Sequence, residues 1–273
     1  MSTIALLTDF GTADVFVGIM KGVIRGLAPQ AVVVDLTHEV PPGDITVGAL
    51  RAWQAAPHLP RGTVLLAVVD PGVGTGRRAI AAATASLAFV GPDNGIFSWV
   101  LALEPGCPAV ELAVPPGSSA TFHGRDVFAP AAARLCSGAP LASLGAPAKD
   151  LKALPFPRLL AENSCARGEV LLHDRFGNVL TSIRISAAGD GVLTVEPWMP
   201  GLRPTRLEGS GFQVLLPGGR AIPVARTFSD VPPGNALAYV GSDGLLEIAV
   251  NGGNAAEALG LSRGSEVILS TEK

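Results

Sequence analysis

The chain has 273 residues, 48% of them hydrophobic and 16% charged, and a formal net charge of −3. This length and apolar content predict one large domain or two smaller ones with a substantial core, and they exclude a disordered chain. The small negative charge, with one Tyr and three Trp, argues against nucleic acid or an anionic membrane surface as a partner.

Neither the N-terminus nor the cysteine pattern indicates export. A strand is expected from residue 4 without the charged lead of a signal peptide, and no apolar run has the length of a membrane span. Cys107, Cys136 and Cys165 are odd in number and widely separated, so neither a disulfide framework nor a Cys-x-x-Cys metal site is expected. We therefore expect a cytoplasmic protein.

The first half alternates expected strands with expected helices. Short apolar runs bounded by Gly or Pro are typical of buried strands, whereas apolar residues three or four apart are typical of helices. The strands are expected at residues 4–10, 31–36, 64–70, 79–90 and 110–114, and the helices at 14–28, 45–56, 96–103 and 127–136. Asp14 is expected at the N-cap or in the first turn of its helix. This alternation predicts an α/β domain over residues 1–150 with a mostly parallel, layered sheet.

The pattern changes after Gly138. Residues 140–157 are rich in Ala, Leu and Pro, which favours a linker between domains. Short strands with frequent turns follow, at residues 169–172, 179–185, 192–195, 212–216, 236–240 and 245–250. This pattern predicts an all-β C-terminal domain over residues 165–273, built as an antiparallel barrel or sandwich.

Carboxylates stand at the ends of three expected strands of the first half: Asp9, Asp35 and Asp70. Under right-handed crossovers these ends share one edge of the sheet, where open α/β sheets bind ligands. Such acids hold either a divalent cation or the hydroxyls and cationic group of a ligand. A structural reading is also open, because Asp caps the helix or loop that follows a strand.

The loop 70–77, Asp-Pro-Gly-Val-Gly-Thr-Gly-Arg, follows the third of these strands. Its glycines and Pro71 impose a tight path that brings Arg77 back toward Asp70, either as a turn with a surface ion pair or as part of a functional site. An isolated His is more often structural than catalytic, but His123 lies among Gly and polar residues just before an apolar helix, a setting that shifts the balance toward a functional role.

Two polar stretches mark the second half. In residues 174–178, Phe176 can stack on a heteroaromatic ring and Asn178 can bond its edge, although the same residues suit a plain hairpin turn. The loops 241–244 and 251–254 surround a strand, and backbone N–H groups of such Gly-rich turns suit a carboxylate or a purine edge. The sequence has no ordinary phosphate or dinucleotide fingerprint.

These stretches belong to an ordered series of motifs. The series comprises Thr8-Asp9-Phe10-Gly11 with Asp14 and Gly18, residues 70–77, residues 91–95, His123-Gly124-Arg125-Asp126, residues 174–178 and residues 241–254. In this series the chain resembles the SAM hydroxide adenosyltransferases, adenosine-forming S-adenosyl-L-methionine (SAM) hydrolases related to the SAM-dependent fluorinase and chlorinase. The resemblance spans about residues 3 to 270.

The resemblance implies an α/β N-terminal domain, a C-terminal β-barrel and a homotrimer that binds SAM between neighbouring subunits. It implies attack of water or hydroxide on the ribose C5′ to give adenosine and L-methionine, with SAM as the substrate and no cofactor or metal. The implied catalytic set is Asp70, Arg77 and His123. The implied substrate contacts are Asp9 for the ribose hydroxyls, Asp174 for the methionine ammonium, Ser242 for its carboxylate, and Phe176 and Asn178 for the adenine, with Asn94, Asn251 and Gly252 as further contacts.

The reaction suits these residue types. A sulfonium leaves as a neutral thioether, so no general acid is needed at the leaving group. We expect Arg77 to stabilise hydroxide developing from a bound water, His123 to accept or relay the proton, and Asp70 to orient the pair.

Several departures separate the chain from the halogenating relatives. Asp243 stands where an Arg follows their carboxylate-binding Ser, Gly43 aligns with an aromatic residue, and their loop insertion is absent. These differences favour hydroxide over halide. Phe16 stands where the family often has Tyr, so that hydroxyl is missing. Two alternatives stay open: a metal-dependent phosphohydrolase that uses the acids at the sheet edge, and a non-catalytic SAM-binding module.

Overall fold

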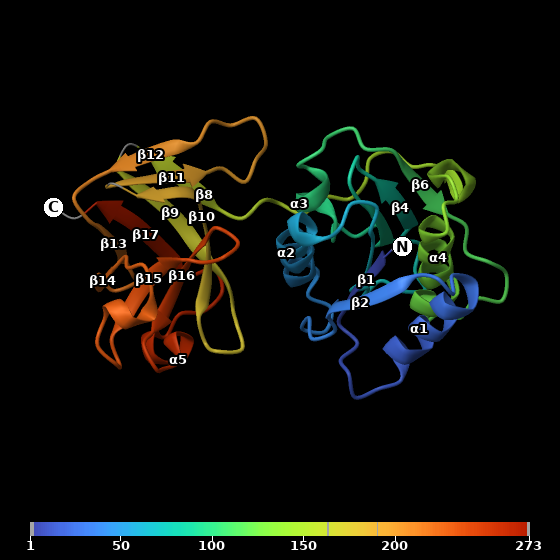
Figure 1. Ribbon diagram of the computed structural model, residues 1–273, viewed down its shortest axis with the longest axis horizontal. Helices are drawn as coiled ribbons and strands as arrows, with labels where there is room; N and C mark the ends of the chain where they lie inside the picture. The colour runs from blue at the N-terminus through green and yellow to red at the C-terminus, as the bar shows by residue number, and fades with distance from the viewer. Residues whose placement is uncertain (1–2, 163, 190, 272–273) are drawn as a thin grey trace. The chain divides into compact units, whose positions relative to one another are not determined.

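The computed structural model describes residues 3–162, 164–189 and 191–271, in two compact units. The first unit is Met1–Leu154 and the second is Pro155–Lys273. Figure 1 shows helices and strands mixed in the first unit, coloured blue to green, and mainly strands in the second, coloured yellow to red. The predicted change from an α/β half to an all-β half is therefore present.

The first unit contains a mixed sheet with helices packed against it. Its strands are β1 (Thr3–Thr8), β2 (Val32–Thr37), β3 (Val64–Val68), β4 (Ala79–Ala83), β5 (Ala88–Pro92), β6 (Ala109–Leu112) and β7 (Gly145–Pro147). Its helices are α1 (Phe16–Leu27), α2 (Ile45–Ala55), α3 (Ser98–Leu101) and α4 (Ala129–Cys136), with short helical turns η1 (Ala56–His58), η2 (Gly124–Phe128) and η3 (Leu141–Ser143). The strand order is β2-β1-β3-β5-β4-β6-β7.

The expectation of a mostly parallel sheet is wrong. β2, β1, β3 and β5 pair in parallel, but β4, β6 and β7 join the sheet antiparallel. The cause is segment 79–90, which the apolar pattern predicts as one strand. It folds as a hairpin of β4 and β5, and its turn is closed by Thr84 N–H donating to Leu87 O at 2.8 Å. The hairpin reverses the chain direction and sets the second half of the sheet antiparallel.

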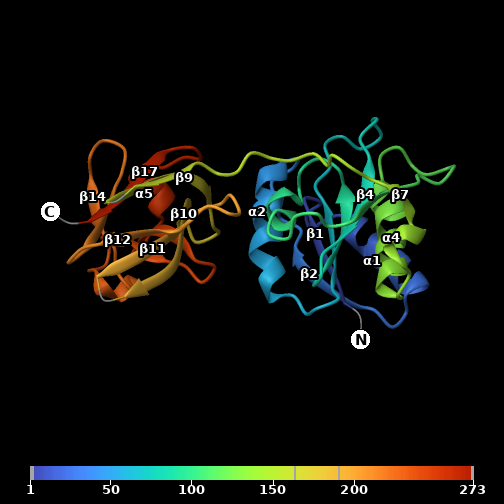
Figure 2. The same ribbon diagram turned by 90° about the horizontal axis from the view of Figure 1, so that it is seen from above.

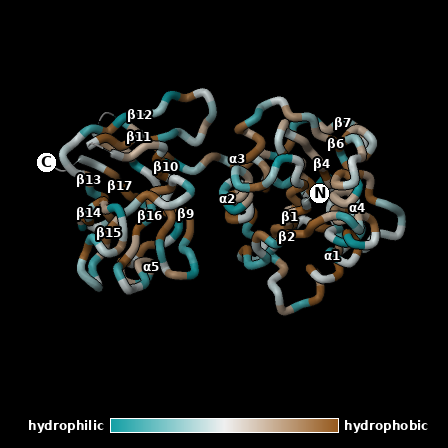
Figure 3. Tube along the Cα trace, in the orientation of Figure 1, coloured by the Kyte–Doolittle hydropathy of each residue, from teal (hydrophilic) through white to brown (hydrophobic). Residues whose placement is uncertain are grey.

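The parallel half of the sheet follows the prediction. β1 pairs with β2 and with β3 in parallel, so Asp9 and Asp70 follow strands that end at the same edge. The prediction that Asp35 ends its strand is wrong, because β2 continues to Thr37 and Asp35 lies within it, opposite Leu6. α2 and α4 both contact β1 and β3, and Figure 2 shows the two helices on opposite sides of these strands. Figure 3 shows hydrophobic residues along the central strands, where Leu6 and Leu66 are fully buried. Each such side chain contributes about 1.5–3 kcal/mol by burial, which holds the sheet edge in place.

The first helix begins later than predicted. α1 starts at Phe16 with Val15 as its N-cap residue, so Asp14 precedes the helix instead of capping it. In α2 an acid does cap the helix, because the Asp44 carboxylate accepts the Val47 N–H at 3.0 Å. A capping role for a carboxylate thus applies to the second helix and not to the first.

Most of the predicted linker, residues 140–157, belongs to the first unit. It contains η3 and β7, and β7 pairs with β6. Asp93 is 2% exposed and pairs with Arg78, which also donates to two backbone carbonyls of this segment. Lys152 N–H donates to Asp93 at 2.8 Å. This partly buried ion pair holds residues 149–152, close to Leu154, where the first unit ends.

The second unit is antiparallel. Its strands are β8 (Leu159–Glu162), β9 (Cys165–His173), β10 (Val179–Gly189), β11 (Val192–Glu196), β12 (Thr205–Glu208), β13 (Phe212–Leu215), β14 (Ala221–Pro223), β15 (Ala236–Val240), β16 (Leu245–Val250) and β17 (Glu266–Thr271), with α5 (Ala255–Leu259) and the turn η4 (Phe228–Asp230). The order is β12-β11-β10-β9-β17-β13-β14, with β16 on β10, β15 on β16 and β8 on β9. The antiparallel β-structure agrees with the prediction, and closure into a barrel stays a prediction.

The core of the second unit lies among these strands and includes the fully buried Ile183, Leu246 and Val267. Across the parts of the chain that the structure covers, no helix combines the length and apolar character that crossing a membrane requires.

Candidate active site

The loop from β3 to β4 folds back on itself, so that the charged side chain at its end meets the residue at its start. Two turns closed by backbone hydrogen bonds of 3.2 and 3.1 Å follow Asp70. Gly74, at φ 75°, passes so close to Ala120 that a Cβ there would lie 2.4 Å from the Ala120 carbonyl oxygen. Only glycine fits this position, because both the left-handed backbone and the close approach exclude a side chain. The path ends with Arg77 beside Asp70.

Arg77 and Asp70 form a buried, forked ion pair. The Arg77 Nε lies 3.0 Å from both carboxylate oxygens, and its Nη2 also donates to Oδ2. Both side chains are 5% exposed. The guanidinium also lies over the Phe128 ring, 5.2 Å from its centroid. Removing one partner of a buried pair costs about 3–5 kcal/mol, so this loop is more than a turn with a surface ion pair.

His123 extends this pair. It stands just before η2, a π-helical turn of a kind common at functional sites, and its Nδ1 lies 2.9 Å from Arg77 Nη2. A guanidinium only donates, so the direction of this bond assigns Nδ1 as the acceptor and puts the ring proton on Nε2. Burial and then the Arg77 charge lower the pKa of His123, against the opposing Asp70 and Asp126 carboxylates. Both observations give a neutral histidine.

One nitrogen of Arg77 has no protein partner. Within the described ranges, Nη1 is buried and no acceptor lies within hydrogen-bond distance of its hydrogens. A buried donor without an acceptor is costly, and such a group is typically satisfied by a water or an ion at a functional site. The cluster therefore offers N–H groups on Arg77 Nη1 and His123 Nε2 to a small oxygen ligand.

Two of the three acids that were predicted at the sheet edge share a pocket. Asp9 and Asp70 line it with Phe10, Phe16, Pro42, Gly43 and Pro71. Asp9 Oδ2 accepts the Gly43 N–H at 2.8 Å, which fixes the carboxylate at the pocket wall. Asp35 lines a different pocket, where its Oδ2 lies 2.6 Å from Lys21 Nζ. Asp9 and Asp70 therefore line one pocket together, whereas Asp35 is paired with Lys21 elsewhere.

Asn94 contacts the backbone just before the loop 70–77. Its Nδ2 donates to the Val69 carbonyl at 2.8 Å, and its Oδ1 accepts the Ile96 N–H at 3.2 Å. Val69 is the residue before Asp70, so this amide fixes the backbone from which the Asp70 carboxylate projects. The structure thus places Asn94 in contact with the scaffold of the site, and substrate contact by this residue stays a prediction.

A second pocket, in the second unit, collects most of the predicted ligand contacts of that half. Its lining is Asp174, Phe176, Asn178, Phe228, Tyr239, Val250, Asn251, Gly252 and Gly253. Phe176 is 73% exposed, which leaves its ring available to stack on a planar ligand. Asn251 is fixed beside it, because its Nδ2 donates to the Val231 carbonyl at 2.8 Å.

The Asp174 carboxylate organises the turn between β9 and β10. Its Oδ1 accepts the Phe176 and Asn178 N–H groups at 2.8 and 2.9 Å, and its Oδ2 accepts Asn178 Nδ2 at 2.9 Å. These bonds orient the exposed ring and the neighbouring amide together. A carboxylate oxygen has more than one lone pair, so Asp174 can still accept from a ligand ammonium.

Ser242 is placed differently from the other predicted contacts. It lies exposed in the turn between β15 and β16, which is closed by Gly244 N–H donating to Gly241 O at 3.0 Å, and it is not part of the lining given above. A role in binding a carboxylate stays a prediction for this residue.

Two aromatic residues of this pocket were missed by the sequence reasoning. Phe228 and Tyr239 lie with ring centroids 5.0 Å apart, and the Tyr239 hydroxyl donates to Glu247. Burial and this hydrogen bond raise the pKa of Tyr239 well above its usual range, so it stays a neutral phenol. The available signals were that Tyr239 is the chain's single Tyr and that Phe228 stands in a polar loop.

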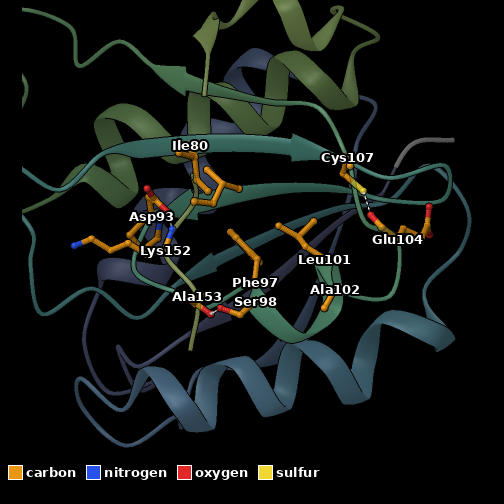
Figure 4. A pocket seen from close by; sticks show the side chains of 14 residues that line it. Ile80, Asp93, Phe97, Ser98, Leu101, Ala102, Glu104, Cys107, Lys152 and Ala153 are labelled. Atoms are coloured by element: carbon orange, nitrogen blue, oxygen red, sulfur yellow. Dashed lines mark hydrogen bonds between the residues drawn. The ribbon is translucent and has the colours of Figure 1, made fainter. Parts of the chain in front are cut away.

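Another cavity of the first unit, of about 250 Å³, has a separate lining (Figure 4). Ile80, Phe97 and Leu101 form apolar walls, and the Cys107 thiol donates to the Glu104 carbonyl. Burial and then the Glu104 charge raise the pKa of Cys107, which makes it a poor nucleophile. None of the predicted site residues lines this cavity.

The described residues contain no group of three or more His, Cys, Asp or Glu side chains arranged to hold a metal ion. Asp9 and Asp70, the acids that share a pocket, are bonded instead to the Gly43 N–H and to Arg77.

Comparisons with known proteins cover nearly the whole chain. Residues 4–145 match the model of the SAM hydroxide adenosyltransferase N-terminal domain, and residues 168–268 match that of the C-terminal domain. The (R)-S-adenosyl-L-methionine hydrolase of Thermus thermophilus is 45% identical over 283 residues, covering 98% of this chain and 100% of that protein. A fluorinase of Nocardia brasiliensis is 26% identical over 300 residues, covering 97% of this chain and 95% of the relative.

A solved structure shows the same fold. The crystal structure of an uncharacterized conserved protein from Thermotoga maritima superposes with a TM-score of 0.84 and 35% sequence identity, over 98% of this chain and 99% of that one.

Proposed function

The chain belongs to the SAM hydroxide adenosyltransferase family, and from that premise we propose that it hydrolyses SAM to adenosine and L-methionine. The Thermus thermophilus relative is named for (R)-SAM, the epimer defined by its sulfonium centre. We extend the proposal to that epimer as the preferred substrate.

The observation that carries the proposal is the buried Asp70–Arg77–His123 cluster. In the proposed reaction an oxygen nucleophile forms a bond to the ribose C5′ while the C5′–S bond breaks, and the electron pair goes to sulfur. The sulfonium thus becomes a neutral thioether, the side chain of methionine, which needs no proton. The demanding part is the nucleophile, because water is weak and hydroxide is scarce at neutral pH.

The directions of the hydrogen bonds define what the cluster does for that nucleophile. Arg77 Nη1 and His123 Nε2 both carry hydrogens, and N–H groups stabilise hydroxide more than water. Asp70 holds Arg77 through Nε and Nη2 and leaves Nη1 for the ligand. The site would therefore select hydroxide whose proton has already gone to solvent. This changes the expected role of His123 from proton acceptor to hydrogen-bond donor.

The remaining roles follow the resemblance and the two pockets. Asp9, in the pocket shared with Asp70, would bind the ribose hydroxyls. In the second unit, Phe176 and Asn178 would contact the adenine and Asp174 the methionine ammonium. Ser242, Asn94, Asn251 and Gly252 complete the proposed contact set. The proposed assembly is a homotrimer with active sites between subunits, which a mass measurement in solution tests directly. A cytoplasmic location and independence from cofactors stay predictions.

The test is product analysis with each sulfonium epimer of SAM, with and without chloride. We expect adenosine and methionine in equal amounts, faster from the (R) epimer, and no chlorinated nucleoside. Binding of SAM without turnover would favour the non-catalytic binding module instead. His123→Ala separates these cases further, because it should lower kcat far more than it weakens SAM binding, whereas equal losses would indicate a binding role.

A further inference from the structure

Two loops at the sheet edge are fastened together around Asp9. One loop follows β1 and the other follows β2. Gly11 N–H donates to the His38 carbonyl at 2.8 Å, and Val40 N–H donates to the Thr8 carbonyl at 3.4 Å. The Asp9 carboxylate itself accepts from the second loop, at Gly43. The orientation of Asp9 therefore depends on how the loop after β2 is held.

The buried His38 side chain connects the loop after β2 to the end of β1. It is 5% exposed, and its Nδ1 lies 2.8 Å from Oγ1 of Thr8, which is fully buried. On the other side of the ring, Nε2 lies 3.0 Å from Asp35 Oδ1, and Asp35 is paired with Lys21. The imidazole thus connects a solvent-facing ion pair to the residue that directly precedes Asp9.

The contacts from Asp35 through His38 to Thr8 are consistent with one set of donors and acceptors. Burial raises the pKa of Asp35, but its interactions with Lys21 and His38 outweigh burial and lower it, so the carboxylate is charged. This charge lies 3.0 Å from Nε2 and favours the ring hydrogen on that nitrogen, although the two atoms are not aligned as a hydrogen bond. Nδ1 then accepts the Thr8 hydroxyl hydrogen, and Thr8 Oγ1 in turn accepts the Phe10 N–H at 3.3 Å. These contacts therefore fix Thr8 and Phe10, the residues on both sides of Asp9.

We infer that His38 is a positioning residue that holds Asp9 in the orientation needed to bind the ribose diol of the substrate. The inference rests on the proposed function, because it takes the ribose hydroxyls as the partner of Asp9. His38 touches no reacting atom: it acts through Thr8 and through its carbonyl bond to Gly11. The sequence pattern gave this histidine no role.

The test compares two substrates, SAM and its analogue without the ribose 2′- and 3′-hydroxyls. The quantity measured is the ratio of kcat/KM between them, for the unaltered protein and for the variants His38→Leu, His38→Asn, Asp9→Ala and His38→Leu/Asp9→Ala. Asn offers an oxygen acceptor near the place of Nδ1, whereas Leu offers none. His58→Leu is the matched control, because His58 is exposed at the end of η1.

The expected result is a loss of selectivity and not of activity in general. His38→Leu lowers the diol preference about tenfold, as the loss of an oriented hydrogen bond to a charged group allows, while kcat/KM for the analogue stays near that of the unaltered protein. His38→Asn keeps more of the preference than His38→Leu. Asp9→Ala removes the preference, and adding His38→Leu to it changes little, because the two residues act through one contact.

Other outcomes overturn the inference. Equal loss of kcat/KM for both substrates in both His38 variants would make His38 a scaffold residue without influence on the diol. Additive losses in the double variant would separate His38 from Asp9. If the unaltered protein hydrolyses neither substrate, the proposed function fails and this inference fails with it.

Discussion

Replacing Arg77 with Lys separates the charge of this residue from its geometry. Lys keeps the positive charge, but a single ammonium replaces the planar fork that contacts both oxygens of Asp70 and Nδ1 of His123. It also removes the Nη1 position, which is buried and has no partner in the part of the chain described. We expect a protein that folds but has lost most of its activity.

The magnitudes follow from the contacts. Lys still gives the buried Asp70 a cationic partner, so the free energy of unfolding should fall by about 1–3 kcal/mol, the range for lost hydrogen bonds to a charged group. Removing the charge entirely, as in Arg77→Met, should cost more, about 3–5 kcal/mol. A single donor to a charged oxygen in an active site is worth about 10²–10³ in kcat, and this is the loss we expect for Lys.

The assay measures adenosine release at saturating SAM together with urea unfolding of the same samples. Arg61→Lys is the matched control, because Arg61 is exposed before β3, and both of its measurements should stay unchanged. A kcat for Arg77→Lys close to that of the unaltered protein would refute the assignment of Nη1 to the nucleophile. A large loss of stability without loss of kcat would make the cluster structural.

The remaining predictions concern pH, the second pocket and metals. The native protein holds the pKa of His123 below its ordinary value of 6.5, so the unfolded state binds more protons as the pH falls. The free energy of unfolding should therefore decrease as the pH is lowered from neutral through 6.5, and His123→Asn should flatten this slope in urea titrations. Asp174→Ala frees the Phe176 and Asn178 groups that its carboxylate orients, so KM for SAM should rise about tenfold or more with a smaller change in kcat. EDTA should leave the rate unchanged, whereas loss of activity that Mg²⁺ restores would favour the metal-dependent phosphohydrolase.

Local chemistry in the sequence was enough to locate two of the three residues of the Asp70–Arg77–His123 cluster. Asp70 and Arg77 stand seven residues apart, and glycines between them leave few paths other than a tight return. His123 is 46 residues farther along, and no local pattern indicates which carboxylate or cation it meets. Its partner depends on how α4 packs against β3, and only the resemblance to a family supplied that link from sequence.

Strand direction was the main failure in predicting the fold. Residues 79–90 form a nearly continuous apolar run, and the turn at Thr84 to Leu87 contains neither Gly nor Pro, so the pattern shows one strand instead of a hairpin. The same limit applies to β7, which composition assigns to a linker although it pairs with β6. Pairing partners are set by contacts distant in sequence, which hydrophobic spacing does not encode.

In the candidate site, too, local sequence predicts some residues, whereas others depend on contacts distant in sequence. Phe176 and Asn178 could be predicted from the sequence because they stand in a Gly-containing turn. Phe228 and Tyr239 line the same pocket only because β15 and the loop before it fold beside that turn. His38 is a further case, since its contacts to Thr8 and Asp35 span different elements.

The most direct test of the account is hydrolysis of SAM in oxygen-18 water, followed by mass analysis of both products. Attack of a water-derived hydroxide at C5′ places one labelled oxygen on the 5′ carbon of adenosine and none in methionine. Label in methionine, or adenosine without label, would contradict the nucleophile assigned to the Asp70–Arg77–His123 cluster.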